Sequence, residues 1–425
     1  MSNLNKTRDN IYFFKANIFL FFATILSNVC MYSFQVITAR YLSVESYGVL
    51  NTALSLNFLF AITALPLQNF VANEVSKLKA HNELCGGFFR FTVHSLLPGI
   101  LLITFVPAIF AVFLGLKAHI SYINILITVI YFTLTNMQML ITGMFQGLQR
   151  FKMLAIVIVL FPISVLFFGA GAAILGYNET GILCGRLLSG VLTISFFYVL
   201  LYRIFIQDKT VYLADRTSIL KYFVLTGSAY VCYNILMQAD ILLVRLFFSS
   251  YETGIYSSAA IFGKAIIYFP AAISLVIFPL IAENTATGGT SAWLLLKSIF
   301  LNTVLSGFGA LFLLLFSEFI VFIFLGNSYM NAIPIIRLYG FAFIPLSMIN
   351  IFFTYFLAKE KYICILPIGI AVLIEVIGTY LFHASLMQVL VNIFIASLIS
   401  NIIFIVFLYD EYKKYKLNNN QEIIH

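Results

Sequence analysis

The stretch GIYSSAAIFGKAIIYFPAAISLVIFPL, from Gly254 to Leu280, is apolar almost throughout and carries a single charge, Lys264. A run of this length can cross a bilayer as an α-helix. Its apolar residues are continuous rather than alternating, which argues against a transmembrane strand. The stretch therefore predicts a membrane-spanning helix with an ammonium group near its middle.

The rest of the chain has the same character. Of its 425 residues, 62% are hydrophobic and 9% are charged, whereas a soluble domain is about half apolar and a quarter charged. We expect an all-α integral membrane protein with about twelve transmembrane helices in two six-helix lobes. The predicted segments are 17–39, 48–72, 91–115, 122–146, 153–176, 180–202, 222–245, 254–281, 293–317, 331–357, 362–382 and 386–409.

The basic residues indicate the orientation. The net charge is +8, but the 24 Lys and Arg residues do not cluster on a soluble face, so we exclude a nucleic-acid partner. With the N-terminus in the cytoplasm, most of them fall on the cytoplasmic side, and Arg40, Lys117 and Arg245 fall on the outer side. The positive-inside rule therefore predicts cytoplasmic termini on a multi-pass protein.

The longest loop, 206–221, separates two halves that resemble each other. ARYLSVESYGVL (Ala39–Leu50) and VRLFFSSYETGIY (Val244–Tyr256) each place Arg at an outer helix end, then Glu in a short loop, then Gly. Parallel repeats of this kind recur in transporters. We predict an N-terminal lobe at 1–205, a cytoplasmic linker at 206–221, a C-terminal lobe at 222–410 and a cytoplasmic tail at 411–425.

The chain lacks the motifs of an enzyme. FGKA at Phe262–Ala265 lacks the first glycine and the final hydroxyl of a nucleotide-binding loop. The five cysteines have no metal-ligand spacing and the five histidines are isolated, and no loop is long enough to carry catalytic acids. We expect no catalytic residues, no metal and no cofactor.

Charges inside the apolar segments are the strongest functional signal. A charge at the bilayer centre costs about 2.5–3.5 kcal/mol on insertion scales. The acids Asp240 and Glu375 are candidates for ion coupling. Asp240 and Lys264 lie on consecutive helices and could form a purely structural ion pair; alternatively, Lys264 lines a cavity that receives an anion. The cations within or at the ends of the segments are Arg40, Arg186, Arg245, Lys264 and Arg337.

Because these five cations outnumber the two acids, we expect some of them to bind an anionic ligand in a cationic cavity. A cation without a counter-charge in a membrane segment needs either water or an anionic ligand.

Four stretches together resemble the polysaccharide exporters, the lipid-linked oligosaccharide flippases of the multidrug/oligosaccharidyl-lipid/polysaccharide exporter superfamily. The resemblance covers most of the chain, and its length suits the twelve-helix O-antigen and capsule flippases rather than the fourteen-helix lipid II flippases. The stretches are ARYLSVESYG (39–48), MFQGLQRFK (Met144–Lys152), QADILLVRLFFSSYETGIYSSAAIFGK (Gln238–Lys264) and FLGNSYMNAIPIIRLYG (Phe324–Gly340).

The resemblance implies a V-shaped pair of lobes that works by alternating access in the cytoplasmic (inner) membrane. The implied cargo is a polyprenyl-diphosphate-linked oligosaccharide, moved to the outer leaflet for O-antigen, lipopolysaccharide or capsule synthesis. Arg40, Lys264 and their companions match the cationic cavities of that family, whereas Arg186 and Glu375 lie outside the matched motifs. Membrane lipids and other glycan assembly proteins are the implied partners.

Two alternatives stay open. A multidrug and toxin exporter of the same superfamily would carry cations and would have an acidic cavity. A non-transporting scaffold of a glycan assembly complex would have a dry, closed core.

Overall fold

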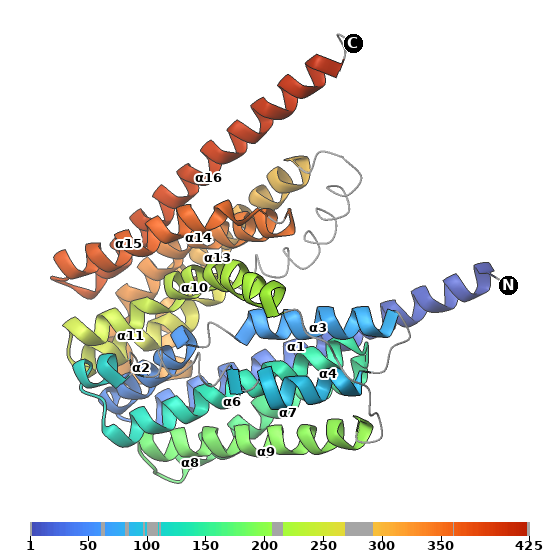
Figure 1. Cartoon of the computed structure of the whole chain (residues 1–425). Helices are drawn as coiled ribbons and strands as arrows, with labels where there is room; N and C mark the ends of the chain where they lie inside the picture. The colour runs from blue at the N-terminus through green and yellow to red at the C-terminus, as the bar shows by residue number, and fades with distance from the viewer. Residues whose placement is uncertain are drawn as a thin grey trace. The chain divides into compact units, whose positions relative to one another are not determined.

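The computed structural model describes residues 2–60, 64–80, 85–96, 98–99, 109, 112–205, 216–267, 292–359 and 361–422. Every regular element within these ranges is helical. The chain divides into two compact units, Met1–Tyr230 and Val231–His425 (Figure 1). The division falls within one helix, α10, and most of the predicted linker 206–221 lies outside the described residues.

The N-terminal unit contains long helices that match the apolar runs of the sequence. α7 continues through a π-helical segment, Val165–Ala170, into the short α8, so that the three form one span. The helices are α1 (Ser2–Tyr41), α2 (Val44–Phe60), α3 (Ala64–Ala80), α4 (Gly86–Phe91), α6 (Tyr122–Gly147), α7 (Phe151–Ser164), α8 (Gly171–Ile174), α9 (Glu179–Phe205) and the first half of α10 (Arg216–Phe247).

Small residues bring the helices of this unit close together. A Cβ on Gly143 of α6 would lie 2.6 Å from the Gln68 carbonyl oxygen of α3, and one on Gly147 would lie 2.6 Å from Val75 Cβ. Such glycine pairs, four residues apart, let membrane helices pack at short range. Beside this crossing, buried side chains of α3, α4, α6, α7 and α9 form one apolar cluster around Phe88 and Phe145.

The C-terminal unit is built on α14, which packs against α13, α11 and α16, while α15 packs against α16 (Figure 1). A buried polar network joins α13 to α14, where Asn302 Nδ2 donates to Ser347 Oγ at 2.9 Å. The helices after α10 are α11 (Ser250–Gly263), α13 (Ala292–Ile320), α14 (Ile333–Ala358), α15 (Ile365–Leu381) and α16 (Leu386–Glu422).

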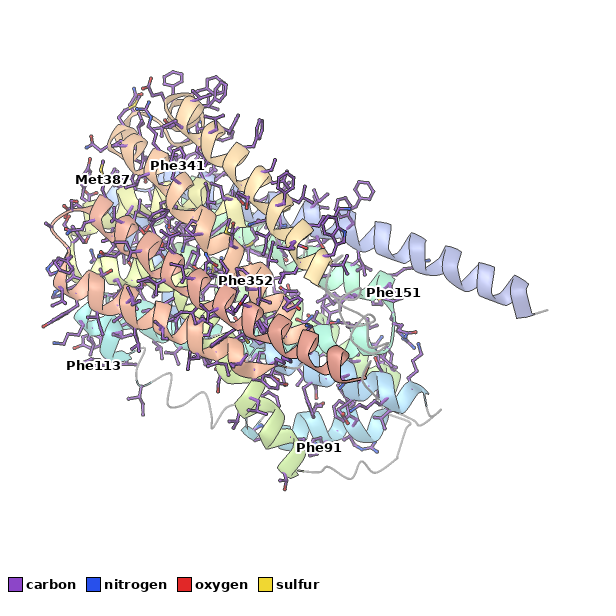
Figure 2. The ribbon with its side chains drawn as sticks, turned by 90° about the horizontal axis from the view of Figure 1, so that it is seen from above. Phe91, Phe113, Phe151, Phe341, Phe352 and Met387 are labelled. Atoms are coloured by element: carbon purple, nitrogen blue, oxygen red, sulfur yellow. The ribbon has the colours of Figure 1, made fainter. Side chains whose placement is uncertain are left out.

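Nine helical segments in the described ranges are long and apolar enough to cross a membrane, and each overlaps a predicted segment. The other predicted segments, 48–72, 91–115 and 254–281, all include residues outside those ranges. Large apolar side chains such as Phe341 and Met387 are about 40% exposed, whereas Phe352 is buried (Figure 2). Exposed apolar side chains on apolar helices are expected where the solvent is lipid.

Candidate functional site

Lys264 lies at the point where α11 ends. The helix begins at a capping box, in which Ser249 Oγ accepts from the backbone N–H of Glu252 and the Glu252 carboxylate accepts from that of Ser249. It ends at Gly263, and Lys264 is its C-cap residue. The predicted helix 254–281 is therefore interrupted at its only charged residue.

The Lys264 ammonium is fully engaged by α10. Its Nζ donates to Asp240 Oδ1 at 2.8 Å, to the Met237 carbonyl oxygen at 2.9 Å and to Gln238 Oε1 at 3.2 Å. An ammonium has three donors and no acceptor, so each donor has a partner. The Asp240 side chain is 1% exposed and that of Lys264 is 13% exposed. The sequence left open whether Asp240 and Lys264 form an ion pair. The structure shows that they do, and the pair is almost completely buried.

Two tyrosines hold the second oxygen of Asp240. The hydroxyl of Tyr256 on α11 donates to Oδ2 at 3.3 Å, and the hydroxyl of Tyr339 on α14 donates to the same oxygen. The ring centroids of the two tyrosines are 5.6 Å apart. Tyr339 fits here because Gly263 has no side chain: a Cβ there would lie 2.0 Å from Tyr339 Cδ1. Asp240 therefore joins three helices.

Glu375 on α15 is a second buried carboxyl beside this group. Its side chain is fully buried, and neither carboxyl oxygen has a hydrogen-bond partner among the described residues. It interacts electrostatically with Asp240 and Lys264. The structure thus brings together both acids and one of the cations that the sequence identified.

The other cations of the C-terminal unit are held differently. Arg245, near the end of α10, donates to Ser250 Oγ at the start of α11. Arg337 on α14 pairs with Glu318 at 2.8 Å, and the two side chains are 40% and 73% exposed. The sequence analysis counted only the acids inside the predicted segments, so it left Arg337 without a counter-charge. The structure supplies one in Glu318, which lies one residue beyond the predicted segment 293–317.

Arg186 in the N-terminal unit is buried and has no acidic partner among the described residues. It lies on α9 and is 5% exposed. Its guanidinium carbon lies 5.0 Å from the Tyr131 ring centroid and 5.6 Å from that of Phe34. Its Nε and Nη1 have no hydrogen-bond partner among the described residues. Arg40, at the end of α1, is exposed.

The sequence did not identify Gln238, Tyr256 or Tyr339 as part of the site. The chain has 24 tyrosines and 46 phenylalanines, so an aromatic residue in an apolar helix is no signal by itself. The recognisable feature was the spacing of Asp240 and Lys264 on consecutive helices. The three neighbours follow from the way α11 and α14 pack on α10, which sequence patterns do not specify.

The family model described as "Polysaccharide biosynthesis protein" matches residues 13–285. No curated protein matches the chain significantly.

Solved structures show the same fold at low identity. An inward-facing multidrug resistance MATE family transporter of the MOP superfamily is 15% identical, with a TM-score of 0.69 and coverage of 93% of this chain and 96% of that chain. Lipid II flippase MurJ in an inward closed conformation is 15% identical, with a TM-score of 0.70 and coverage of 92% and 87%. MATE multidrug transporter DinF-BH is 14% identical, with a TM-score of 0.59 and coverage of 92% and 95%.

These matches confirm the predicted fold class, an all-α integral membrane protein of about twelve helices in two lobes. The matched proteins are transporters and a flippase rather than enzymes, in agreement with the sequence.

Proposed function

The chain belongs to the polysaccharide biosynthesis protein family, and from this premise we propose that it is a flippase for polyprenyl-diphosphate-linked oligosaccharides. The cargo serves a surface polysaccharide such as O-antigen, lipopolysaccharide or capsule. It moves from the cytoplasmic to the outer leaflet of the cytoplasmic (inner) membrane by alternating access through a cationic cavity. The likeness to a lipid II flippase supports a lipid-linked cargo.

The observation that carries this proposal is the buried cation Arg186. Its guanidinium lies against two aromatic rings, with Nε and Nη1 unpartnered among the described side chains. A desolvated cation–π contact contributes about 2 kcal/mol or more, whereas leaving a buried charge uncompensated costs about 3–5 kcal/mol. A diphosphate supplies both the missing charge and the acceptors.

The remaining cations extend the proposed binding set. Lys264 stands beside the acids of the C-terminal unit. Arg40 and Arg245 lie at the ends of α1 and α10, at the matching positions of the two halves, and Arg337 lies on α14 with part of its side chain exposed. We assign all five to the diphosphate or to the sugars next to it.

Asp240 and Glu375 are the proposed groups for ion coupling. Both are buried carboxyls within the membrane-spanning helices, and Glu375 has no hydrogen-bond partner in the described structure. A buried carboxyl of this kind binds a proton or another cation, so it can couple an ion gradient to transport.

The proposed arrangement is a lobe at 1–205, a linker at 206–221, a lobe at 222–410 and a tail at 411–425, with both termini cytoplasmic. A reporter enzyme fused after residue 410 tests it. Activity on the cytoplasmic side agrees with this topology, and activity on the outer side contradicts it.

Deletion of the gene tests the function. We expect a polyprenyl-diphosphate-linked oligosaccharide to accumulate on the cytoplasmic leaflet and the corresponding surface polysaccharide to disappear. Chemical analysis of the accumulated lipid then identifies its sugars. Normal surface polysaccharide with no accumulated lipid contradicts the proposal.

The second candidate is an exporter of organic cations. It is favoured by Glu375, because an unpartnered buried carboxyl suits a cationic ligand. The chain should then lower the accumulation of a cationic dye in cells, and Glu375→Gln should abolish that effect. A flippase for diphosphate lipids is not expected to change dye accumulation.

A further inference from the structure

Lys264 has no hydrogen-bond donor left over for a ligand. Its contacts with Asp240, Met237 and Gln238, at 2.8, 2.9 and 3.2 Å, use the three donors of an ammonium. A phosphate can bind Lys264 only if at least one of these contacts breaks. Lys264 therefore cannot bind the cargo while it keeps all three of its observed contacts.

Asp240 cannot simply be left behind when Lys264 moves away. The carboxylate is 1% exposed, and its other oxygen is held by the hydroxyls of Tyr256 and Tyr339. Those hydroxyls donate hydrogen bonds but bring no positive charge. A buried carboxylate that loses its counter-ion is strongly disfavoured. Another cation has to take the place of the ammonium.

We propose that Lys264 is an exchangeable counter-ion, which leaves Asp240 for the diphosphate of the cargo while one monovalent cation replaces it at Asp240. The inference rests on the proposed function, because it takes the diphosphate cargo as given. The charges balance. Before the exchange Asp240 is neutralised by Lys264; afterwards it is neutralised by the cation, and Lys264 neutralises one charge of the diphosphate.

The surroundings of Lys264 suit this exchange. Oxygens of Asp240, Met237 and Gln238 already surround the ammonium. Hard metal cations prefer oxygen ligands, so the same atoms suit a sodium ion, whereas a proton needs only the Asp240 carboxylate. The charged and titratable groups around Asp240 are Lys264 and Tyr256 from α11, Tyr339 from α14 and Glu375 from α15.

Lys264 is the less enclosed member of the ion pair. It is the C-cap residue of α11, and its side chain is 13% exposed, against 1% for Asp240. Asp240, in contrast, is fixed by two hydroxyls from two helices. The moving group in the exchange is therefore Lys264.

The exchange predicts that the cation and the cargo bind together, since each favours the other by the same factor. The test uses the full-length protein in lipid nanodiscs and a polyprenyl diphosphate lipid as the probe. Its Kd is measured against pH in choline chloride, and against sodium at constant ionic strength and fixed pH. One linked proton weakens binding by up to about tenfold per pH unit as pH rises. If sodium is the cation, added sodium tightens binding instead.

Asp240→Asn is the decisive variant, because the amide keeps the shape of the side chain and removes its charge. Lys264 is then released without a replacing cation, so the variant should bind the probe at least as tightly as the wild type and show no dependence on pH or sodium. Glu74→Gln is the matched control. Glu74 pairs with Lys77 at the same 2.8 Å distance, but Lys77 is 60% exposed, so the cation dependence should stay that of the wild type.

A second variant tests the proposal if Asp240→Asn does not fold. Gln238→Met removes one acceptor from Lys264 and keeps the carboxylate. It should bind the probe more tightly than the wild type and retain the dependence on the cation.

The possible failures differ from one another. Wild-type binding that depends on neither pH nor sodium overturns the exchange and leaves the flippase proposal standing. The same holds if Asp240→Asn keeps the full wild-type dependence. If the probe does not bind the wild type under any of these conditions, the flippase proposal fails and the exchange falls with it.

Discussion

Arg186 in the N-terminal unit and Lys264 in the C-terminal unit are both cations within apolar helices, but their surroundings are opposite. Arg186 lies against the faces of Phe34 and Tyr131, and its Nε and Nη1 have no acceptor among the described residues. Lys264 has an acidic partner and three acceptors. The same physical problem, a positive charge away from water, is answered once by aromatic rings and once by oxygen atoms.

The difference suggests two separate tasks. The aromatic faces leave the in-plane N–H groups of Arg186 available, which suits a permanent site for an anion. All three N–H donors of Lys264 already have acceptors. The lysine can therefore bind an anion only after another cation has neutralised Asp240. Under the proposed function, Arg186 binds the cargo directly, and Lys264 connects cargo binding to an ion.

The largest effect is expected from Lys264→Ala. Loss of a charged hydrogen bond to phosphate lowers affinity by about tenfold or more, and the variant also leaves Asp240 without its counter-ion. Export of the surface polysaccharide should therefore be abolished while the protein still inserts, and Lys264→Arg should retain part of it. Cell-surface glycan and protein level are measured together.

Combining Lys264→Ala with Asp240→Ala separates the two interpretations of that loss. A cargo-binding lysine predicts that the double variant also fails to export. A purely structural pair predicts that export returns at normal protein levels, and that result would remove the difference between the two cations on which the proposal depends.

Arg186 should give the next largest effect. Arg186→Met keeps much of the apolar volume and removes the charge, so export should fall by about tenfold. Thermal stability should be unchanged or higher, because a buried unpaired cation is costly to the fold. Arg186→Lys should recover only part of the export, since lysine lacks the planar fork.

The contrary result for Arg186 is also clear. A large fall in thermal stability of Arg186→Met, with export per folded molecule unchanged, would show that the aromatic rings hold a structural cation rather than a binding group.

Gly263→Ala should give a smaller effect, directed at the packing of the Asp240 group. The new Cβ would lie 2.0 Å from Tyr339 Cδ1, so Tyr339 or α11 has to shift, which disturbs the hydrogen bond from Tyr339 to Asp240. Overpacking of this kind costs about 1–3 kcal/mol of stability. The control is Gly307→Ala in α13, where no atom lies within 4 Å of the added Cβ. Thermal unfolding in detergent compares the two, and equal melting temperatures would contradict the close packing of α11 on α14.

The smallest effect is expected for the exposed pair Lys77–Glu74. Its N···O distance of 2.8 Å equals that of Lys264–Asp240, but the Lys77 side chain is 60% exposed. Exposed pairs contribute about 0–1 kcal/mol. Lys77→Ala should leave the melting temperature and export close to those of the wild type. A loss as large as that of Lys264→Ala would show that burial does not distinguish the two pairs.

The fold was readable from the sequence to the extent that apolar length determines it. Each of the nine membrane-crossing segments in the described part of the chain overlaps a segment predicted from its apolar run. The π-helical segment Val165–Ala170 and the end of α11 at Gly263 were not predicted. They change the hydrogen-bonding pattern within a run whose apolar composition stays the same, so hydropathy carries no sign of them.

The site was readable only where charge stands out against an apolar background. Asp240, Lys264 and Glu375 were identified because a charge in a membrane helix is expensive. Tyr256 and Tyr339 were missed because a tyrosine in such a helix is common in this chain. The partner of Arg337 was missed because Glu318 lies just past the end of its segment. Which helices face one another is a property of packing that single-sequence patterns do not contain.

The most direct test of the flippase proposal is translocation by the purified protein. Proteoliposomes are prepared with a polyprenyl-diphosphate-linked oligosaccharide in the bilayer. An enzyme added outside modifies only oligosaccharide in the outer leaflet, so the molecules in the inner leaflet form an internal pool that is protected until it is translocated. The wild type should make the internal pool accessible in the presence of an ion gradient, and Lys264→Ala should leave it protected, like liposomes without protein. Protection of the pool with the wild type, or equal access with Lys264→Ala, would contradict the proposed role.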